Sequence, residues 1–270
     1  VVGIVVVGGA FYVNPENWQP FAPHHFAGIS SAAAIIFFAN IGFDAVSTAA
    51  EETRNPQRNV PIAIIASLVV CTIIYIAVAI VLTGMLRSEH YAGVADPLAK
   101  AFSGRGVNWL AGVISFGAVF ATTSVLLVFQ LGQPRIFFSM ARDGLLPAWA
   151  ARVHPKYRTP HVTTILTGVA VAGFAAVSNI NEVVELCNIG TLFAFVLVAL
   201  AVMVLRWVEP ERKRPFRTPL FPWIPLLAIA SCLWLMLALP RVTWVRFAVW
   251  LAIGLVIYFA YGRRNSRISK

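Results

Sequence analysis

Long apolar stretches separated by short polar intervals run along the whole chain. Seven of them approach the roughly 20 residues that a helix needs to cross the hydrocarbon core of a bilayer. They cover about 29–50, 62–86, 108–133, 161–178, 183–206, 222–240 and 244–262. A shorter apolar piece, 1–13, precedes them. The pattern predicts an all-α, polytopic membrane protein that sits in a lipid bilayer.

Composition supports the same interpretation. Of the 270 residues, 59% are hydrophobic and only 12% are charged, about half the roughly 25% charged content of an ordinary globular domain. The longest polar interval, about 134–160, is too short to bury a core of its own, so we expect no soluble domain. Its prolines, at positions 134, 147, 155 and 160, predict short interfacial helices there instead of a span.

Basic residues favour one side of the predicted membrane. If residues 51–61 face the cytoplasm, alternate crossings place 134–160, 206–221 and the C-terminus after 262 on the same side. Those segments hold 16 Lys and Arg residues, whereas the opposite side holds five, namely Arg87, Lys100, Arg105, Arg241 and Arg246. The positive-inside rule therefore predicts that these segments are cytoplasmic loops of a cell-membrane protein. The net charge of +10 is then explained without a nucleic-acid partner.

The stretch 29–50 carries polar residues near its middle: Asn40, Gly42 and Asp44. An ionised carboxylate at that depth costs a few kcal/mol, and glycine weakens a helix by about 1 kcal/mol relative to alanine. Free backbone groups are tolerated there only where they line a cavity or bind something. We therefore predict an interruption of the helix within about 39–44 and a ligand site beside it. Alternatively, Asp44 hydrogen-bonds to another helix and Gly42 permits close packing.

Charged residues follow at the cytoplasmic end of this stretch. Glu51, Glu52 and Arg54 are either ordinary loop charges or an ion-paired gate that opens toward the cytoplasm. The three cysteines fall inside predicted spans without metal-ligand spacing, so we expect no metal site. The chain also has no phosphate-binding loop motif, no HExxH and no recognisable Ser/His/Asp constellation. An ATP-driven pump or a metallohydrolase therefore has no support.

Four segments together resemble the cationic amino-acid transporter branch of the amino acid–polyamine–organocation (APC) permeases. They are FFANIGFDAVSTAAEETRNPQRNVPIAI, RIFFSMARDGLLPAWAARVHPKYRTPHVTTI, ELCNIGTLFAFVLVALAVMVLR and YGRRNS. They occur in this order over about 35–265, which is nearly the whole chain. One of these segments alone would say little, but the four in order are specific.

The resemblance implies the inverted-repeat (LeuT-like) transporter fold, in which two five-helix repeats are followed by two further helices. On that map, 1–13 ends the fifth helix, 14–28 is an extracellular loop, 29–206 is the second repeat with helices six to ten, and 207–270 holds helices eleven and twelve with a cytoplasmic tail. The first repeat is missing. We expect a C-terminal fragment of a longer permease that does not transport without that repeat.

The resemblance also implies the site. Substrate-binding residues would be Phe38, Ala39, Ile41, Gly42 and Asp44. Backbone carbonyls of Phe38, Ala39 and Ile41 would hold the α-ammonium of an amino acid, with Asp44 as a buried acid nearby. The Phe38 ring would act as a lid and would form the gate together with Glu51, Glu52 and Arg54. Asn40 stands where many relatives have an aromatic residue, which leaves the side-chain specificity open.

The function so implied is proton-coupled secondary active transport of an amino acid, with no covalent chemistry and no cofactor other than the proton gradient. Whether the substrate is cationic or small and neutral stays open. One alternative is a membrane-embedded enzyme using Asp44, Glu51 and Glu52 as acid–base groups, which would need a nucleophile or metal cluster nearby. Another is an ion channel, which would need repeated filter segments. Neither feature is visible in the sequence.

Overall fold

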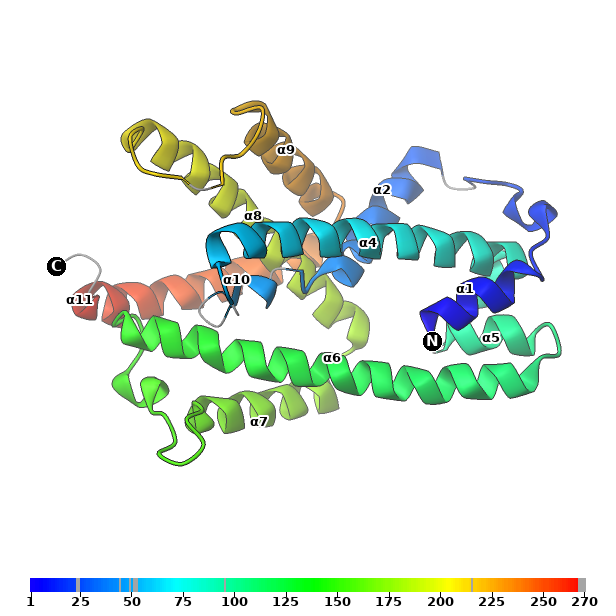
Figure 1. The fold of residues 1–270 in the computed structure, drawn as a ribbon, viewed down its shortest axis with the longest axis horizontal. Coiled ribbons are helices and arrows are strands. Elements are labelled where there is room, and N and C mark those ends of the chain that lie inside the picture. The colour runs from blue at the N-terminus through cyan, green and yellow to red at the C-terminus, as the bar shows by residue number, and fades with distance from the viewer. Residues whose placement is uncertain are drawn as a thin grey trace. The chain divides into compact units, whose positions relative to one another are not determined.

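The computed structural model describes residues 1–22, 25–43, 45–48, 50, 53–94, 96–214 and 216–266, and its regular elements there are all helical. The α-helices in Figure 1 are α1 Val2–Ala10, α2 His25–Ile36, α3 Ala45–Thr48, α4 Pro56–Met85, α5 Pro97–Ser103, α6 Asn108–Arg142, α7 His161–Val177, α8 Ile180–Val208, α9 Trp223–Leu237, α10 Arg241–Ile257 and α11 Arg263–Asn265. Short 3-10 helices occur at η1 Pro15–Trp18, η2 Phe37–Asn40, η4 Ser88–Tyr91 and η5 Ala148–Ala151, and a π-helical turn, η6 Tyr258–Gly262, continues α10.

Helices form over all seven of the predicted apolar stretches. Within the described ranges, four are long and apolar enough to cross a membrane: α4, α6, α8 and the continuous run from Arg241 to Asn265. The apolar helices α7 and α9 have 17 and 15 residues, which at about 1.5 Å per residue cover roughly 25 and 22 Å. The prediction of an all-α, multi-pass membrane protein is confirmed.

One predicted boundary is wrong. The stretch 108–133 was expected to end before Pro134, yet α6 continues through this proline to Arg142. Proline removes a backbone donor and usually kinks or ends a helix, but membrane helices tolerate it where neighbouring groups compensate. Pro134 is fully buried, and one turn earlier the side-chain amide of Gln130 donates to the Thr164 carbonyl of α7 at 2.7 Å, which holds this part of α6 against α7. Residues 143–160 hold only the short helix η5, as expected for a segment that does not span.

The chain divides into two compact units. One comprises Val1–Gly28 with Ile65–Val128, and the other comprises Ile29–Ile64 with Phe129–Lys270. The core of the first unit contains Val5, Val81, Met85, Phe102 and Ile114. The division cuts through α4 between residues 64 and 65 and through α6 between residues 128 and 129. It therefore does not test the repeat boundaries at 29 and 206, which stay predictions.

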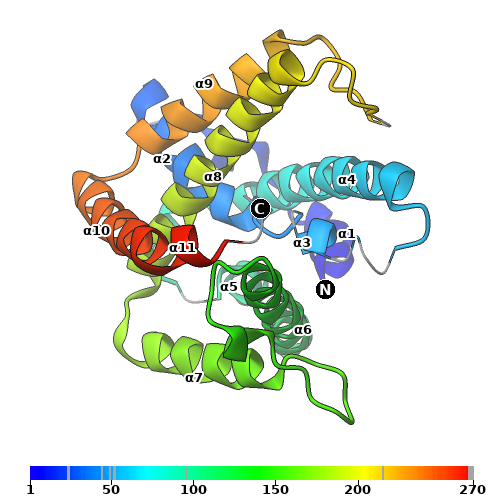
Figure 2. The ribbon, with the colours of Figure 1, turned by 90° about the vertical axis from the view of Figure 1, so that its left-hand side faces the viewer.

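In the second unit, α8 contacts α9, α10 and η2. It lies side by side with α9 in both ribbon views (Figures 1 and 2). Ile189 and Leu192 of α8, Met236 of α9, Leu239 just after α9 and Ala34 of α2 form one buried apolar cluster. Two polar contacts join α8 to α10. The buried Thr243 hydroxyl donates to the Glu185 carboxylate at 2.5 Å, and Arg246 pairs with Glu182 at 2.7 Å. These contacts hold the start of α8 in place.

Candidate functional site

The first complete membrane stretch is broken where the sequence predicts. Helix α2 ends at Ile36, the backbone tightens into the 3-10 turn of η2, and Ile41 is extended with φ −64° and ψ 132°. Gly42 then has φ +124°, and α3 begins at Ala45. Figure 2 labels the two halves, α2 and α3, as separate ribbons. The interruption predicted within 39–44 is confirmed.

Gly42 explains why the chain breaks at this position. Its φ lies in a region that glycine adopts freely and residues with a Cβ atom avoid. Among the described residues, a Cβ atom built here would meet the Phe129 ring at 3.7 Å, which is ordinary van der Waals contact. Backbone conformation, and not lack of space, is therefore what requires glycine.

Four of the predicted substrate-binding residues lie in this break. The Ile41 amide donates to the Phe38 carbonyl at 3.1 Å and so closes the last turn of η2. The Phe38 side chain is 43% exposed and Ala39 is also exposed, whereas Ile41 and Gly42 are half-buried. The break thus presents a short irregular backbone segment beside an exposed aromatic ring, and the role of Phe38 as a lid stays a prediction.

Three other members of the predicted site are not placed. Asp44, Glu51 and Glu52 lie outside the described residues. Arg54 is exposed, and its carbonyl accepts from the Asn59 side chain at 2.6 Å, just before α4 begins. The ion-paired gate therefore stays a prediction.

Asn188 and Phe195 of α8 make polar and aromatic contacts with the broken helix, and sequence reasoning missed both. Asn188 is fully buried, and its side-chain nitrogen donates to the Ala34 and Ile35 carbonyls at 2.9 and 3.2 Å. The Phe195 ring lies 6.2 Å from the Phe37 ring and 5.5 Å from the Phe43 ring, so it contacts both sides of the break. An amide inside an apolar stretch was a usable signal for Asn188. Phe195 is one of nineteen phenylalanines in the chain, and nothing in the sequence distinguished it from the others.

Asn40 contributes a polar side chain to the same region. Its amide oxygen is buried and has no hydrogen-bond partner among the described residues. A buried acceptor of this kind usually finds a donor from water or a ligand. The irregular segment therefore carries unused hydrogen-bonding capacity next to the predicted substrate carbonyls.

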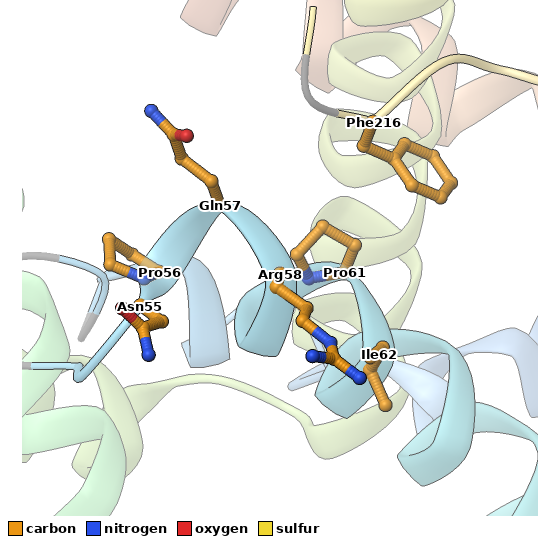
Figure 3. A pocket seen from close by; sticks show the side chains of 7 residues that line it. All are labelled: Asn55, Pro56, Gln57, Arg58, Pro61, Ile62 and Phe216. Carbon is orange, nitrogen blue, oxygen red and sulfur yellow. The ribbon is translucent and has the colours of Figure 1, made fainter.

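A pocket of about 740 Å³ has a lining that includes none of these residues (Figure 3). It is lined by Asn55, Pro56, Gln57, Arg58, Pro61, Ile62 and Phe216. Most of the lining belongs to the start of α4, immediately after Arg54. The pocket therefore follows Arg54 directly in sequence, and none of its described lining residues belongs to the helix break.

Comparison with known proteins supports this picture. The family model described as amino acid permease matches residues 1–260. The branched-chain amino acid permease BcaP of Bacillus subtilis is 50% identical over the whole chain, and the methylthioribose transporter of the same organism is 45% identical over the whole chain. A vacuolar cationic amino acid transporter 4 of Arabidopsis thaliana is 39% identical over 78% of this chain and 36% of its own length. The chain spans 58% of the length of each of the two bacterial relatives.

The matched region extends from α1 to the π-helical turn that follows α10, so it includes the helix break and its contacts with α8. The four sequence segments, the all-helical membrane architecture and the family match agree. This chain belongs to the amino acid permease family of the APC superfamily.

Proposed function

We propose that the full-length protein is a secondary active permease that moves an amino acid across the cell membrane, driven by the proton gradient. The observation that carries this proposal is the helix break at Ile41 and Gly42 inside a membrane stretch. Such breaks are where discontinuous transporter helices bind substrates and coupling ions. Membership of the permease family favours transport over the enzyme and the channel considered above.

In this mechanism the carbonyl end of the first half-helix holds the α-ammonium of the substrate. The last carbonyls of a helix carry partial negative charge and lack partners within the helix, so they attract a cation. Phe38 closes over the bound substrate, and Asp44 supplies an acid that can take part in proton coupling. The α-carboxylate is held by a part of the full-length protein outside this chain, which corresponds to the first repeat of the inverted-repeat fold.

The names of the relatives point to more than one class of substrate. The relatives are named for branched-chain amino acids, for methylthioribose and for cationic amino acids. A backbone site that binds an ammonium group favours an amino acid. Methylthioribose is the second candidate, because one relative of 45% identity is named for it.

Uptake into liposomes containing the purified full-length protein tests the proposal. Radiolabelled leucine, lysine and methylthioribose are supplied separately, each with and without an inward proton gradient. We expect saturable uptake of an amino acid that increases with the gradient and falls when a protonophore dissipates it. Uptake of methylthioribose alone would contradict the amino-acid assignment, and uptake that ignores the protonophore would contradict proton coupling.

Orientation in the membrane gives a second prediction. Because basic residues gather in 51–61, 134–160, 206–221 and the C-terminus, these segments are expected to face the cytoplasm. Lys156→Cys and Lys100→Cys are introduced separately into full-length protein whose Cys71, Cys187 and Cys232 are replaced by alanine. A membrane-impermeant maleimide applied to intact cells should label position 100 at once and position 156 only after permeabilisation. Labelling of both positions in intact cells would overturn this topology.

A further inference from the structure

Asn188 occupies an unusual position for an amide side chain. It lies within the apolar helix α8, it is 0% exposed, and its nitrogen donates to the carbonyls of Ala34 and Ile35. Two carbonyl oxygens face the same side-chain atom, so that atom must be the nitrogen of the amide. The amide oxygen has no partner among the described residues.

The two carbonyls that Asn188 binds belong to the last turn of α2. An α-helix leaves its final carbonyls without intrahelical partners, and α2 ends two residues after Ala34 as the backbone tightens into η2. A buried carbonyl without a donor is costly. Asn188 therefore binds the helix end that directly precedes Phe38, Ala39 and Ile41.

The same face of α8 continues toward the break. Positions 188, 192 and 195 have the spacing of one helical face. Leu192 lies in the buried cluster with Ala34, and the Phe195 ring contacts Phe37 and Phe43. Since α8 is itself joined to α10 through Glu185 and Thr243, it provides a fixed support along the broken helix.

We propose that Asn188 is a positioning residue of the substrate site. By holding the end of α2 against α8, it sets the place at which η2 and the break present their carbonyls to the substrate ammonium. The inference rests on the proposed function, because a positioned carbonyl matters only if a substrate is bound there. Asn188 itself need not contact the substrate.

Two substitutions in the full-length protein separate this role from simple packing. Asn188→Leu keeps a similar volume but leaves both carbonyls without a donor, and we expect the KM for the amino acid to rise by about tenfold or more. Asn188→Asp has nearly the same shape, but its carboxylate would face two carbonyl oxygens at neutral pH. Once protonated, the introduced acid can donate to one of them. The KM of this variant, divided by the wild-type KM at the same pH, should therefore fall toward 1 as the pH is lowered.

Matched controls come from the same helix. Asn181 is exposed at the start of α8, so Asn181→Leu and Asn181→Asp should keep the wild-type KM at every pH. Hydrogen exchange of the backbone amides in 34–43, measured by mass spectrometry on the purified proteins, gives a readout that needs no transport. We expect faster exchange there in Asn188→Leu than in the wild type, and a slowing in Asn188→Asp at low pH.

The outcomes are distinguishable. Wild-type KM and wild-type exchange in both Asn188 variants would overturn the positioning role. A KM ratio for Asn188→Asp that stays well above 1 at every pH would also overturn it, and this comparison still decides the question if Asn188→Leu fails to fold. If the wild-type protein transports no amino acid, the proposed function fails, whereas the exchange data still show whether Asn188 holds the end of α2.

Discussion

Replacing Gly42 with alanine in the full-length protein is expected to lower the rate of amino-acid uptake by about tenfold to a hundredfold. At φ +124° an alanine is strained, and residues forced into such sparsely populated backbone regions typically cost about 1–3 kcal/mol. The segment can relieve this strain only by changing its backbone conformation. Such a change moves the carbonyls of Phe38 to Ile41 away from their positions in the break. Initial rates of uptake into liposomes measure the effect.

Gly173→Ala is the matched control. Gly173 lies inside α7, and a Cβ atom added there meets none of the described residues within 4 Å. Alanine is favoured over glycine in a helix by about 1 kcal/mol, so this variant should transport normally and should be at least as stable as the wild type. Normal uptake by Gly42→Ala would show that the irregular backbone is not needed for transport, and the backbone site would then be wrong.

Asp44 is expected to tolerate neither alanine nor asparagine. Both substitutions remove the charge, whereas asparagine keeps nearly the same shape, so the pair separates charge from packing. Hydrogen bonds to charged groups contribute about 1.5–3 kcal/mol each, and losing two of them would lower transport by about a hundredfold or more. We expect similar losses in both variants when uptake is measured at equal amounts of folded protein in the membrane.

An exposed acid provides the comparison for Asp44. Asp143 follows α6 and lies 4.0 Å from Arg142, with both side chains well exposed, and exposed pairs of this kind contribute little. Asp143→Asn should therefore leave uptake close to the wild-type value. Full activity of Asp44→Asn, in contrast, would reduce Asp44 to a hydrogen-bonding residue and would remove it from proton coupling.

The sequence predicts those features that depend on residues close together along the chain. Hydrophobic length alone located the helices, because a span must bury its whole length in lipid and must satisfy its backbone internally. The break at Gly42 was also predictable, since glycine acts on its own backbone and an acid two residues later is costly in the same helix. Family membership likewise followed from four local segments read in order.

Tertiary contacts decided what local patterns could not. Pro134 reads as the end of a helix, yet α6 continues to Arg142 beside α7. Glu185 reads as a favourable charge near the start of a helix, but it accepts a hydrogen bond from Thr243, 58 residues later. Asn188 binds carbonyls about 154 residues earlier, at the very end of α2. A side chain's partner at such separation depends on how the helices pack, and no pattern within one helix contains that information.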